Sequence, residues 1–145
     1  MALIQRSVLV GYAAEKMYAL VDQVEHYPEF LPWCGRTHVD YRDGALTRAS
    51  ILIDFRGIKQ AFQTENRTEP PHLIEIKLVS GPFRTLDGTW RFQPLAAHAC
   101  RVDFRLHYEF SSKMLERLVG PVFHYIASSF IDAFAKRAER LYGKG

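Results

Sequence analysis

The middle of the chain, from Arg36 to Phe110, alternates apolar and polar side chains. In the longest run, Cys100–Phe110, every second residue is apolar and the residues between are polar or charged. Shorter runs with the same period are Ile51–Phe55, Ile74–Leu78 and Leu86–Phe92. A period of two is typical of strands that bury one face and expose the other. Turn-forming residues separate the runs at Arg42–Gly44, Pro70–Pro71, Ser80–Pro82 and Pro94–Ala99. The pattern therefore predicts an antiparallel meander of about six strands.

The N-terminal part of the chain has a different pattern. Ala2–Val10 is rich in apolar and β-branched residues, which predicts one further strand. Ala13–Leu20 places its apolar residues on one side of a helix, which predicts a short helix. Asp22 is expected to cap a second short helical turn that ends near Pro28.

The C-terminal part changes period again. Apolar residues recur at spacings of three and four from Leu115 to Leu141, which predicts an amphipathic helix of roughly seven or eight turns. Gly120 and Pro121 are expected to kink this helix or to separate a first short piece from it. Polar residues interrupt its most apolar stretch, which argues against a membrane span. They are His124, Ser128, Ser129 and Asp132.

Together these elements predict a single domain over residues 1–145, of the α+β class. A curved, seven-stranded antiparallel sheet is expected to wrap around the long C-terminal helix, with two short helices after the first strand. The length is sufficient for one hydrophobic core. One helix about 10 Å wide cannot fill the whole concavity of a twisted sheet. An apolar cavity beside the helix is therefore expected.

The segment His26–Gly35, HYPEFLPWCG, matches neither a helical nor a strand period. Its prolines fix the backbone and present a cluster of apolar side chains, which suits a lid over the cavity. The alternative is that these side chains simply plug the end of the core. The candidate ligand-binding residues in the lid are Tyr27, Pro28, Phe30, Leu31, Pro32 and Trp33.

Further candidate ligand-binding residues come from inward positions of the strands and from the helix, although ordinary core packing is an alternative for each of them. They are Phe83, Trp90, Phe92, Phe104, Tyr108, Phe123, Ile126 and Phe130. Gly88 occupies an inward strand position, which indicates a bulge or space left for another group.

The net charge of +3 is concentrated at the C-terminus. Residues 113–145 hold six basic and three acidic residues, whereas the first 112 residues hold thirteen of each. Lys136, Arg137, Arg140 and Lys144 are therefore candidate contacts for an anionic partner, such as RNA or an anionic membrane surface. The alternative is that these cations complement the dipole of a solvated helix end.

The sequence gives little support to catalysis. It contains no nucleophile motif, phosphate loop or dinucleotide fingerprint. The histidines are scattered, at His26, His38, His72, His98, His107 and His124. His26 and Cys34 lack the paired spacing of a zinc site. We expect no catalytic residue, metal, cofactor or DNA partner, and we leave open that His124 or Tyr125 faces the cavity.

Cys34 and Cys100 are the only cysteines, and they imply no disulfide framework. The first residues lack the apolar core of a signal peptide. The expected location is the cytoplasm, with peripheral contact to the inner membrane as a variant of that expectation.

Several segments resemble one known family. They are RSVLV (Arg6–Val10), AEKMYALV (Ala14–Val21), YPEFLPWC (Tyr27–Cys34), GPF (Gly81–Phe83), LDGTWRF (Leu86–Phe92), CRVDFRLHYEF (Cys100–Phe110) and FIDAFAKRAERLY (Phe130–Tyr142). The chain resembles the START-like proteins of the coenzyme Q-binding and RatA (ribosome association toxin) family, within the polyketide cyclase/dehydrase group. This resemblance implies the helix-grip fold.

The resemblance implies two activities. Members of one branch resemble lipid-binding chaperones that hold ubiquinone and support respiration. Members of the RatA branch bind the large ribosomal subunit and block its association with the small one. Combined with the expected cavity, the resemblance leads us to expect non-catalytic binding of an isoprenoid, with ubiquinone as the ligand. The alternative is RatA-like ribosome binding, and a polyketide cyclase or dehydratase is a third possibility.

Overall fold

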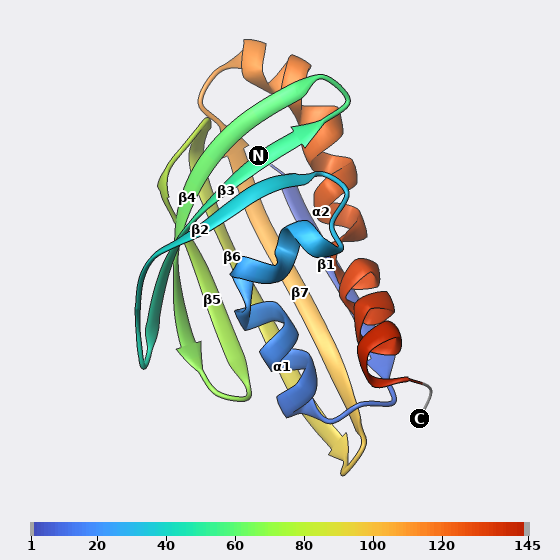
Figure 1. Ribbon diagram of the computed structural model, residues 1–145. Helices are drawn as coiled ribbons and strands as arrows, with labels where there is room; N and C mark the ends of the chain where they lie inside the picture. Colours follow the sequence, from blue (N-terminus) through green and yellow to red (C-terminus); the bar gives the residue numbers. More distant parts are fainter. Residues whose placement is uncertain (1, 144–145) are drawn as a thin grey trace.

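The computed structural model describes residues 2–143, which form one seven-stranded antiparallel sheet and one long helix (Figure 1). The strands are β1 (Ala2–Val10), β2 (Cys34–Asp43), β3 (Leu46–Phe55), β4 (Ile58–Glu69), β5 (Leu73–Ser80), β6 (Phe83–Ala96) and β7 (Ala99–Phe110). Their order in the sheet is β1-β7-β6-β5-β4-β3-β2, so β1 is added beside the last strand of a meander. This confirms the predicted α+β, helix-grip architecture.

Two short helices and one long helix complete the fold. They are α1 (Ala14–Asp22), the 3-10 helix η1 (Val24–Glu29) and α2 (Lys113–Tyr142). Figure 1 shows the sheet curving around α2, with α1 and η1 closing the near side. Gln23 precedes η1 and no side chain caps it, so the prediction that Asp22 is the cap is wrong. Asp22 is instead the last residue of α1.

Helix α2 is continuous through Pro121, so the prediction of a separate first piece is wrong. Proline in a helix interior removes one backbone hydrogen bond. Burial of Val119 and Phe123 on either side of Pro121 offsets this loss by fixing both parts of the helix on the sheet. At its start, the Ser112 hydroxyl accepts a hydrogen bond from the Leu115 amide at 3.2 Å.

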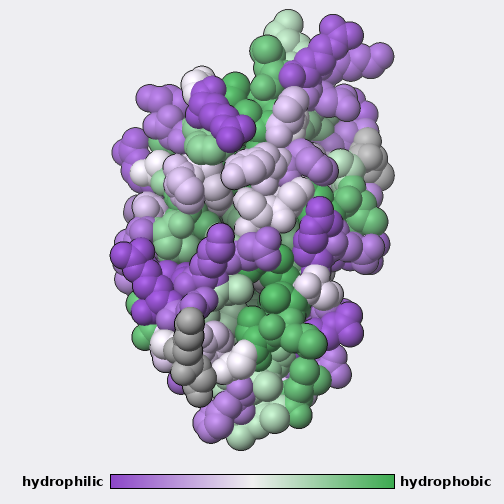
Figure 2. Space-filling model, turned by 90° about the vertical axis from the view of Figure 1, so that its right-hand side faces the viewer, coloured by the Kyte–Doolittle hydropathy of each residue, from purple (hydrophilic) through white to green (hydrophobic). Residues whose placement is uncertain are grey.

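The core lies between α2 and the concave face of the sheet. The inward residues of β7 illustrate the predicted alternation, because Cys100, Val102, Phe104 and Leu106 are buried while Arg101 and Arg105 are exposed. Helix α2 is long and apolar enough to cross a membrane by length and composition, a test that core helices also pass. Part of its apolar surface is buried against the sheet, including Val119, Phe123, Ile126 and Phe134, whereas Met114, Leu118 and Leu141 are exposed. Figure 2, which looks onto the side of α2, shows hydrophilic residues over much of that surface with a hydrophobic stretch in its lower half.

Candidate functional site: an aromatic-lined cavity and its outer groove

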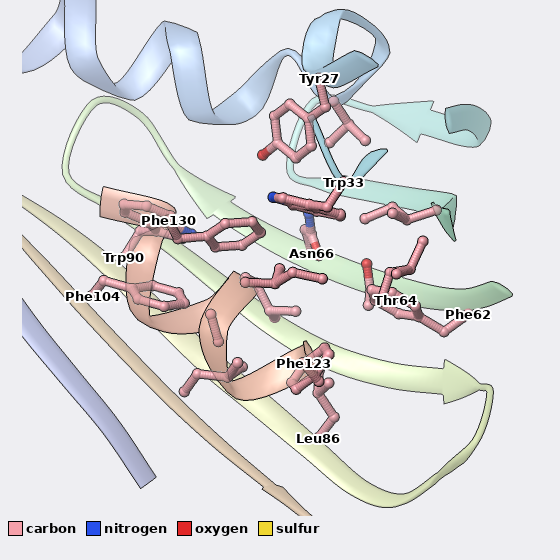
Figure 3. A pocket seen from close by; sticks show the side chains of 17 residues that line it. Tyr27, Trp33, Phe62, Thr64, Asn66, Leu86, Trp90, Phe104, Phe123 and Phe130 are labelled. Atoms are coloured by element: carbon pink, nitrogen blue, oxygen red, sulfur yellow. The ribbon is translucent and has the colours of Figure 1, made fainter. Parts of the chain in front are cut away.

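A small cavity lies between the concave face of the sheet and α2 (Figure 3). Its volume is about 60 Å³, and its lining is almost entirely apolar. The lining residues are Val24, Tyr27, Trp33, Ile51, Ile53, Phe62, Thr64, Asn66, Ile76, Leu86, Trp90, Phe104, Leu106, Phe123, Ile126, Ala127 and Phe130. They come from η1, from strands β3 to β7, from the segment that joins η1 to β2, and from α2.

Aromatic side chains occupy most of the space that the sheet curvature creates. The ring centroids of Trp33 and Phe130 lie 5.2 Å apart, and those of Trp90 and Phe104 lie 4.5 Å apart. Trp90 also contacts Phe134 edge-on at 5.2 Å. Such contacts are favourable beyond the area that they bury. The expected cavity is therefore present, but it is narrow because these rings fill it.

The predicted ligand-binding residues divide into two groups. Tyr27, Trp33, Trp90, Phe104, Phe123, Ile126 and Phe130 line the cavity. Pro28, Phe30, Leu31, Pro32, Phe83, Phe92 and Tyr108 do not line it. Phe83 and Tyr108 pack around Phe123, nearer the N-terminal end of α2, while Phe92 packs against Tyr18 of α1. These three are core residues that sequence parity alone could not separate from the cavity wall.

Other lining residues were missed by sequence reasoning. Ile51, Ile53, Leu86 and Leu106 have the inward parity that the alternation predicts, so this signal could have found them. Thr64 and Asn66 carried no such signal, because polar residues at inward positions of β4 interrupt its apolar pattern. Both are buried, and the Asn66 Oδ1 atom has no hydrogen-bond partner among the described residues.

The predicted lid is packed into the core. Tyr27 and Trp33 are buried, and the Tyr27 hydroxyl donates a hydrogen bond to the Val21 carbonyl. Burial also raises the pKa of Tyr27 far above its ordinary value, so this hydroxyl stays protonated. Leu31 is fully buried as well. In this conformation the segment acts as the plug that we considered as the alternative to a lid.

A groove of about 410 Å³ lies on the other side of this plug. Its lining includes Phe30, Leu31, Pro32 and Trp33 from the plug, Phe55 and Tyr125, and Lys136, Arg137 and Arg140 from α2. Trp33 lines both the groove and the cavity, so its indole is the wall between them.

The basic residues of the C-terminal segment that were predicted to contact an anionic partner are not equivalent. The Arg137 side chain is 13% exposed, and its Nη2 atom lies 3.0 Å from Glu29 Oε1. Its guanidinium also lies over the Phe30 ring, 4.9 Å from the centroid. Arg137 of α2 therefore contacts the plug through Glu29 and Phe30, and its charge is already paired with the Glu29 carboxylate. Lys136 and Arg140 line the groove, and Lys144 lies outside the described residues.

The cavity offers little for acid–base chemistry. Among the described residues that line it there is no Asp, Glu, His, Lys or Cys. His124 and Tyr125 are both exposed and neither lines the cavity, so the idea that one of them faces the cavity is wrong. The Tyr125 ring instead stacks on Phe55 at the end of β3, beside the cavity. No group of acidic, histidine and cysteine side chains within residues 2–143 is arranged to hold a metal ion.

The two thiols are free and buried. Burial raises the pKa of the Cys34 thiol to about 11, and the pKa of the Cys100 thiol is raised to about 11 for the same reason. A protonated thiol is a poor nucleophile, so neither group is activated for covalent chemistry.

A model of the family described as polyketide cyclase / dehydrase and lipid transport matches residues 10–135. The chain belongs to this family. The family description covers cyclases, dehydrases and lipid transport, so membership does not show a particular activity.

Within the polyketide cyclase/dehydrase and lipid transport family, two curated relatives are informative. The ribosome association toxin RatA of Vibrio cholerae serotype O1 is 43% identical over 141 residues, covering 97% of this chain and 98% of the relative. The mitochondrial coenzyme Q-binding protein COQ10 homolog B of Xenopus laevis is 30% identical over 142 residues, covering 95% of this chain and 58% of the relative. The expected resemblance is thereby confirmed, and it is stronger toward the RatA relative.

The fold of this family member also matches solved structures. The Zhui aromatase/cyclase from Streptomyces sp. R1128 superimposes with a TM-score of 0.84 over 99% of both chains, at 13% identity. At this identity the likeness shows the fold alone.

Proposed function

We propose that this chain associates with the ribosome, binding the large subunit and hindering its union with the small one, without catalysing a reaction. The observation that carries the proposal is the 43% identity, over nearly the full length of both chains, to a protein named ribosome association toxin RatA. The similarity to the coenzyme Q-binding relative is lower and covers little more than half of that protein. A ribosomal partner also implies a cytoplasmic location, which is part of this proposal.

The size of the cavity supports the same choice. A volume of about 60 Å³ is below the roughly 150 Å³ that holds benzene in an engineered protein cavity. Sites for drug-sized ligands are larger still, at about 300–1,000 Å³. A quinone ring with an isoprenoid tail would require Trp33, Phe130 and their neighbours to move. The preferred expectation of a ubiquinone carrier is therefore less well supported than its alternative.

Sedimentation with purified ribosomal subunits tests the proposal. The protein is mixed with separated large subunits, with small subunits, or with neither, and is centrifuged through a sucrose cushion. We expect it in the pellet with large subunits only, and we expect added protein to lower the fraction of joined ribosomes. Recovery in the supernatant of all three samples would contradict the proposal.

Carriage of an apolar ligand is the second candidate, favoured by the position of Trp33 between the cavity and the outer groove. A ligand would enter by displacing this indole. Mass spectrometry of lipids extracted from protein purified from a quinone-producing bacterium tests it. Near-stoichiometric ubiquinone, lost when Trp33 and Phe30 are both changed to Ala, would favour the carrier. An empty protein would favour the ribosomal role.

A further inference from the structure

The outer face of the sheet carries a hollow that is separate from the cavity and from the groove beside α2. Its volume is about 400 Å³. It lies over β1, β6 and β7 and is lined by Gln5, Arg6, Ser7, Thr89, Arg91, Arg101, Asp103, Phe104 and Arg105. Phe104 is buried, so the side chains that face solvent in the hollow are polar or charged.

The charges in the hollow are mostly positive. Four arginines line it with one carboxylate, Asp103. Arg101 Nε lies 2.9 Å from Asp103 Oδ1, and the Ser7 hydroxyl donates to the same oxygen. Asp103 is therefore neutralised within the hollow. Arg91 and Arg105 are exposed and form no side-chain hydrogen bond or ion pair with any residue between 2 and 143.

The strand register fixes the spacing of these guanidinium groups. Arg91 lies opposite Asp103, and Arg105 lies between Gln5 on β1 and Thr89 on β6. At about 3.4 Å per residue, Arg101 and Arg105 are separated by about 14 Å along β7, with Arg91 on the adjacent strand between their levels. The hydrogen-bonded sheet holds this arrangement, so little backbone ordering is required when a ligand binds.

We propose that this hollow binds phosphate groups of an RNA backbone, with Arg91 and Arg105 as the principal contacts. This inference rests on the proposed function, because the ribosome is the partner that supplies the RNA. The planar guanidinium group matches phosphate oxygens with two parallel hydrogen bonds, and neutralising a phosphate releases counterions. Phe104, the aromatic residue of the lining, is buried and offers no face on which a base could stack, so the contacts of the hollow are to the RNA backbone and carry no sequence preference.

An RNA partner fits the hollow better than a membrane. Surfaces that lie on membranes combine cations with exposed apolar or aromatic side chains that enter the lipid. The lining of the hollow lacks such side chains. The groove beside α2 has exposed apolar and aromatic side chains. However, Arg137 forms an ion pair with Glu29 there, so Lys136 and Arg140 are the described cations of the groove that do not pair with Glu29.

Two matched double variants test the inference. The first, Arg91→Gln with Arg105→Gln, neutralises the hollow. The second, Lys136→Gln with Arg140→Gln, removes the same charge from α2. Each protein is tested for binding to large ribosomal subunits and to a fluorescent single-stranded RNA at several salt concentrations, and to vesicles containing anionic phospholipid. Thermal unfolding checks that both variants fold like the unchanged protein.

We expect the hollow variant to bind both large subunits and single-stranded RNA about tenfold or more weakly, and the slope of log K against log salt to fall by about 0.7 per lost phosphate contact. The α2 variant should retain most of the binding. Equal binding by both variants and the unchanged protein would overturn the inference while leaving the ribosomal role intact.

Failure of the proposed function is distinguishable from this result. If the unchanged protein does not bind ribosomal subunits but the hollow variant still loses affinity for single-stranded RNA, the phosphate site stands and the ribosomal role fails. If the hollow variant loses only vesicle binding, the site recognises lipid headgroups and the inference is wrong.

Discussion

The two faces of the sheet are built from the same strands and serve different ends. Trp90 and Arg91 are consecutive residues of β6, yet Trp90 is 1% exposed and packs against rings of β7 and α2, while Arg91 is exposed in the hollow on the outer face. Phe104 and Arg105 of β7 repeat this contrast. Because successive side chains of a strand point to opposite faces of the sheet, adjacent residues can be apolar and buried on one face and charged and exposed on the other.

The contrast teaches where stability and recognition are located. The concave face buries aromatic surface, which stabilises the fold by about 25 cal/mol per Å² of apolar area. The convex face leaves guanidinium groups in water, where they contribute little to stability and remain available to a partner. Changes on the inner face should therefore alter unfolding, and changes on the outer face should alter binding.

The largest expected effect comes from Trp90. Trp90→Ala removes a fully buried ring whose centroid lies 4.5 Å from that of Phe104 and 5.2 Å from that of Phe134. The change should lower the free energy of unfolding by about 3–5 kcal/mol. Arg91→Ala, one residue away, should change it by less than about 0.5 kcal/mol. Urea denaturation measures both. A cost below about 1 kcal/mol for Trp90→Ala would mean that the rings around the cavity rearrange easily, which would revive the carrier hypothesis.

A smaller effect is expected at Gly88. A Cβ atom there would lie 2.9 Å from the Arg105 carbonyl oxygen and 3.0 Å from Leu106 Cδ1. The register is regular at this point, so Gly88 allows a close approach and does not mark a bulge. Gly88→Ala should cost about 1–3 kcal/mol, whereas Thr89→Ala on the outer face should cost much less. Equal losses of unfolding free energy for Gly88→Ala and Thr89→Ala in urea denaturation would show that the close approach at Gly88 does not constrain the inner face.

Asn66 offers a stabilising change within the inner face. Asn66 is 9% exposed, and its Oδ1 atom lacks a hydrogen-bond partner among the described residues. Asn66→Leu removes a buried acceptor without emptying the space, and should raise the free energy of unfolding by about 1 kcal/mol. Asn66→Ala is the control, because it removes the same amide but enlarges the cavity and should destabilise. Loss of co-purified lipid from Asn66→Leu would instead assign the amide to a ligand.

Much of the fold could be predicted from the sequence, because strand and helix periods are local. The alternation at Cys100–Phe110 identified β7 and its buried face correctly. Helix α2 was predicted for the same reason, but its continuity through Pro121 depends on burial of Val119 and Phe123, which is a tertiary effect.

The site was less predictable, because a cavity is a property of packing between distant segments. Parity places Phe92 and Phe104 on the same face, but only the position of α1 decides that Phe92 packs on Tyr18 and not on the cavity. The hollow on the outer face was not predicted from the sequence, because the excess of positive charge lies in the C-terminal segment. Its arginines are spread over three strands that become neighbours only when β1 pairs with β7.

The remaining expected effects concern pH, and they have opposite signs for buried and exposed groups. Burial raises the pKa of Cys34 and Cys100 from an ordinary value of 9.0 to about 11. Above pH 9 the unfolded chain loses these protons while the folded chain retains them, so their contribution to stability is complete below pH 9 and is lost as pH rises toward 11.

Asp40 behaves in the opposite way. Hydrogen bonds from Ser50, Gln63 and His38 lower the pKa of its carboxyl from 3.8 to about 2. Its contribution is present above pH 3.8 and is lost as pH falls toward 2. Because Asp40 is near the surface, this contribution is small. Urea midpoints between pH 2 and 11 should show a shallow acid decline that Asp40→Asn reduces, and an alkaline decline that a Cys34→Ala, Cys100→Ala variant reduces. If the thiol variant showed the same decline of the urea midpoint at alkaline pH as the unchanged protein, burial would not raise the thiol pKa values. The contrast between these buried groups and the exposed Asp40 would then be wrong.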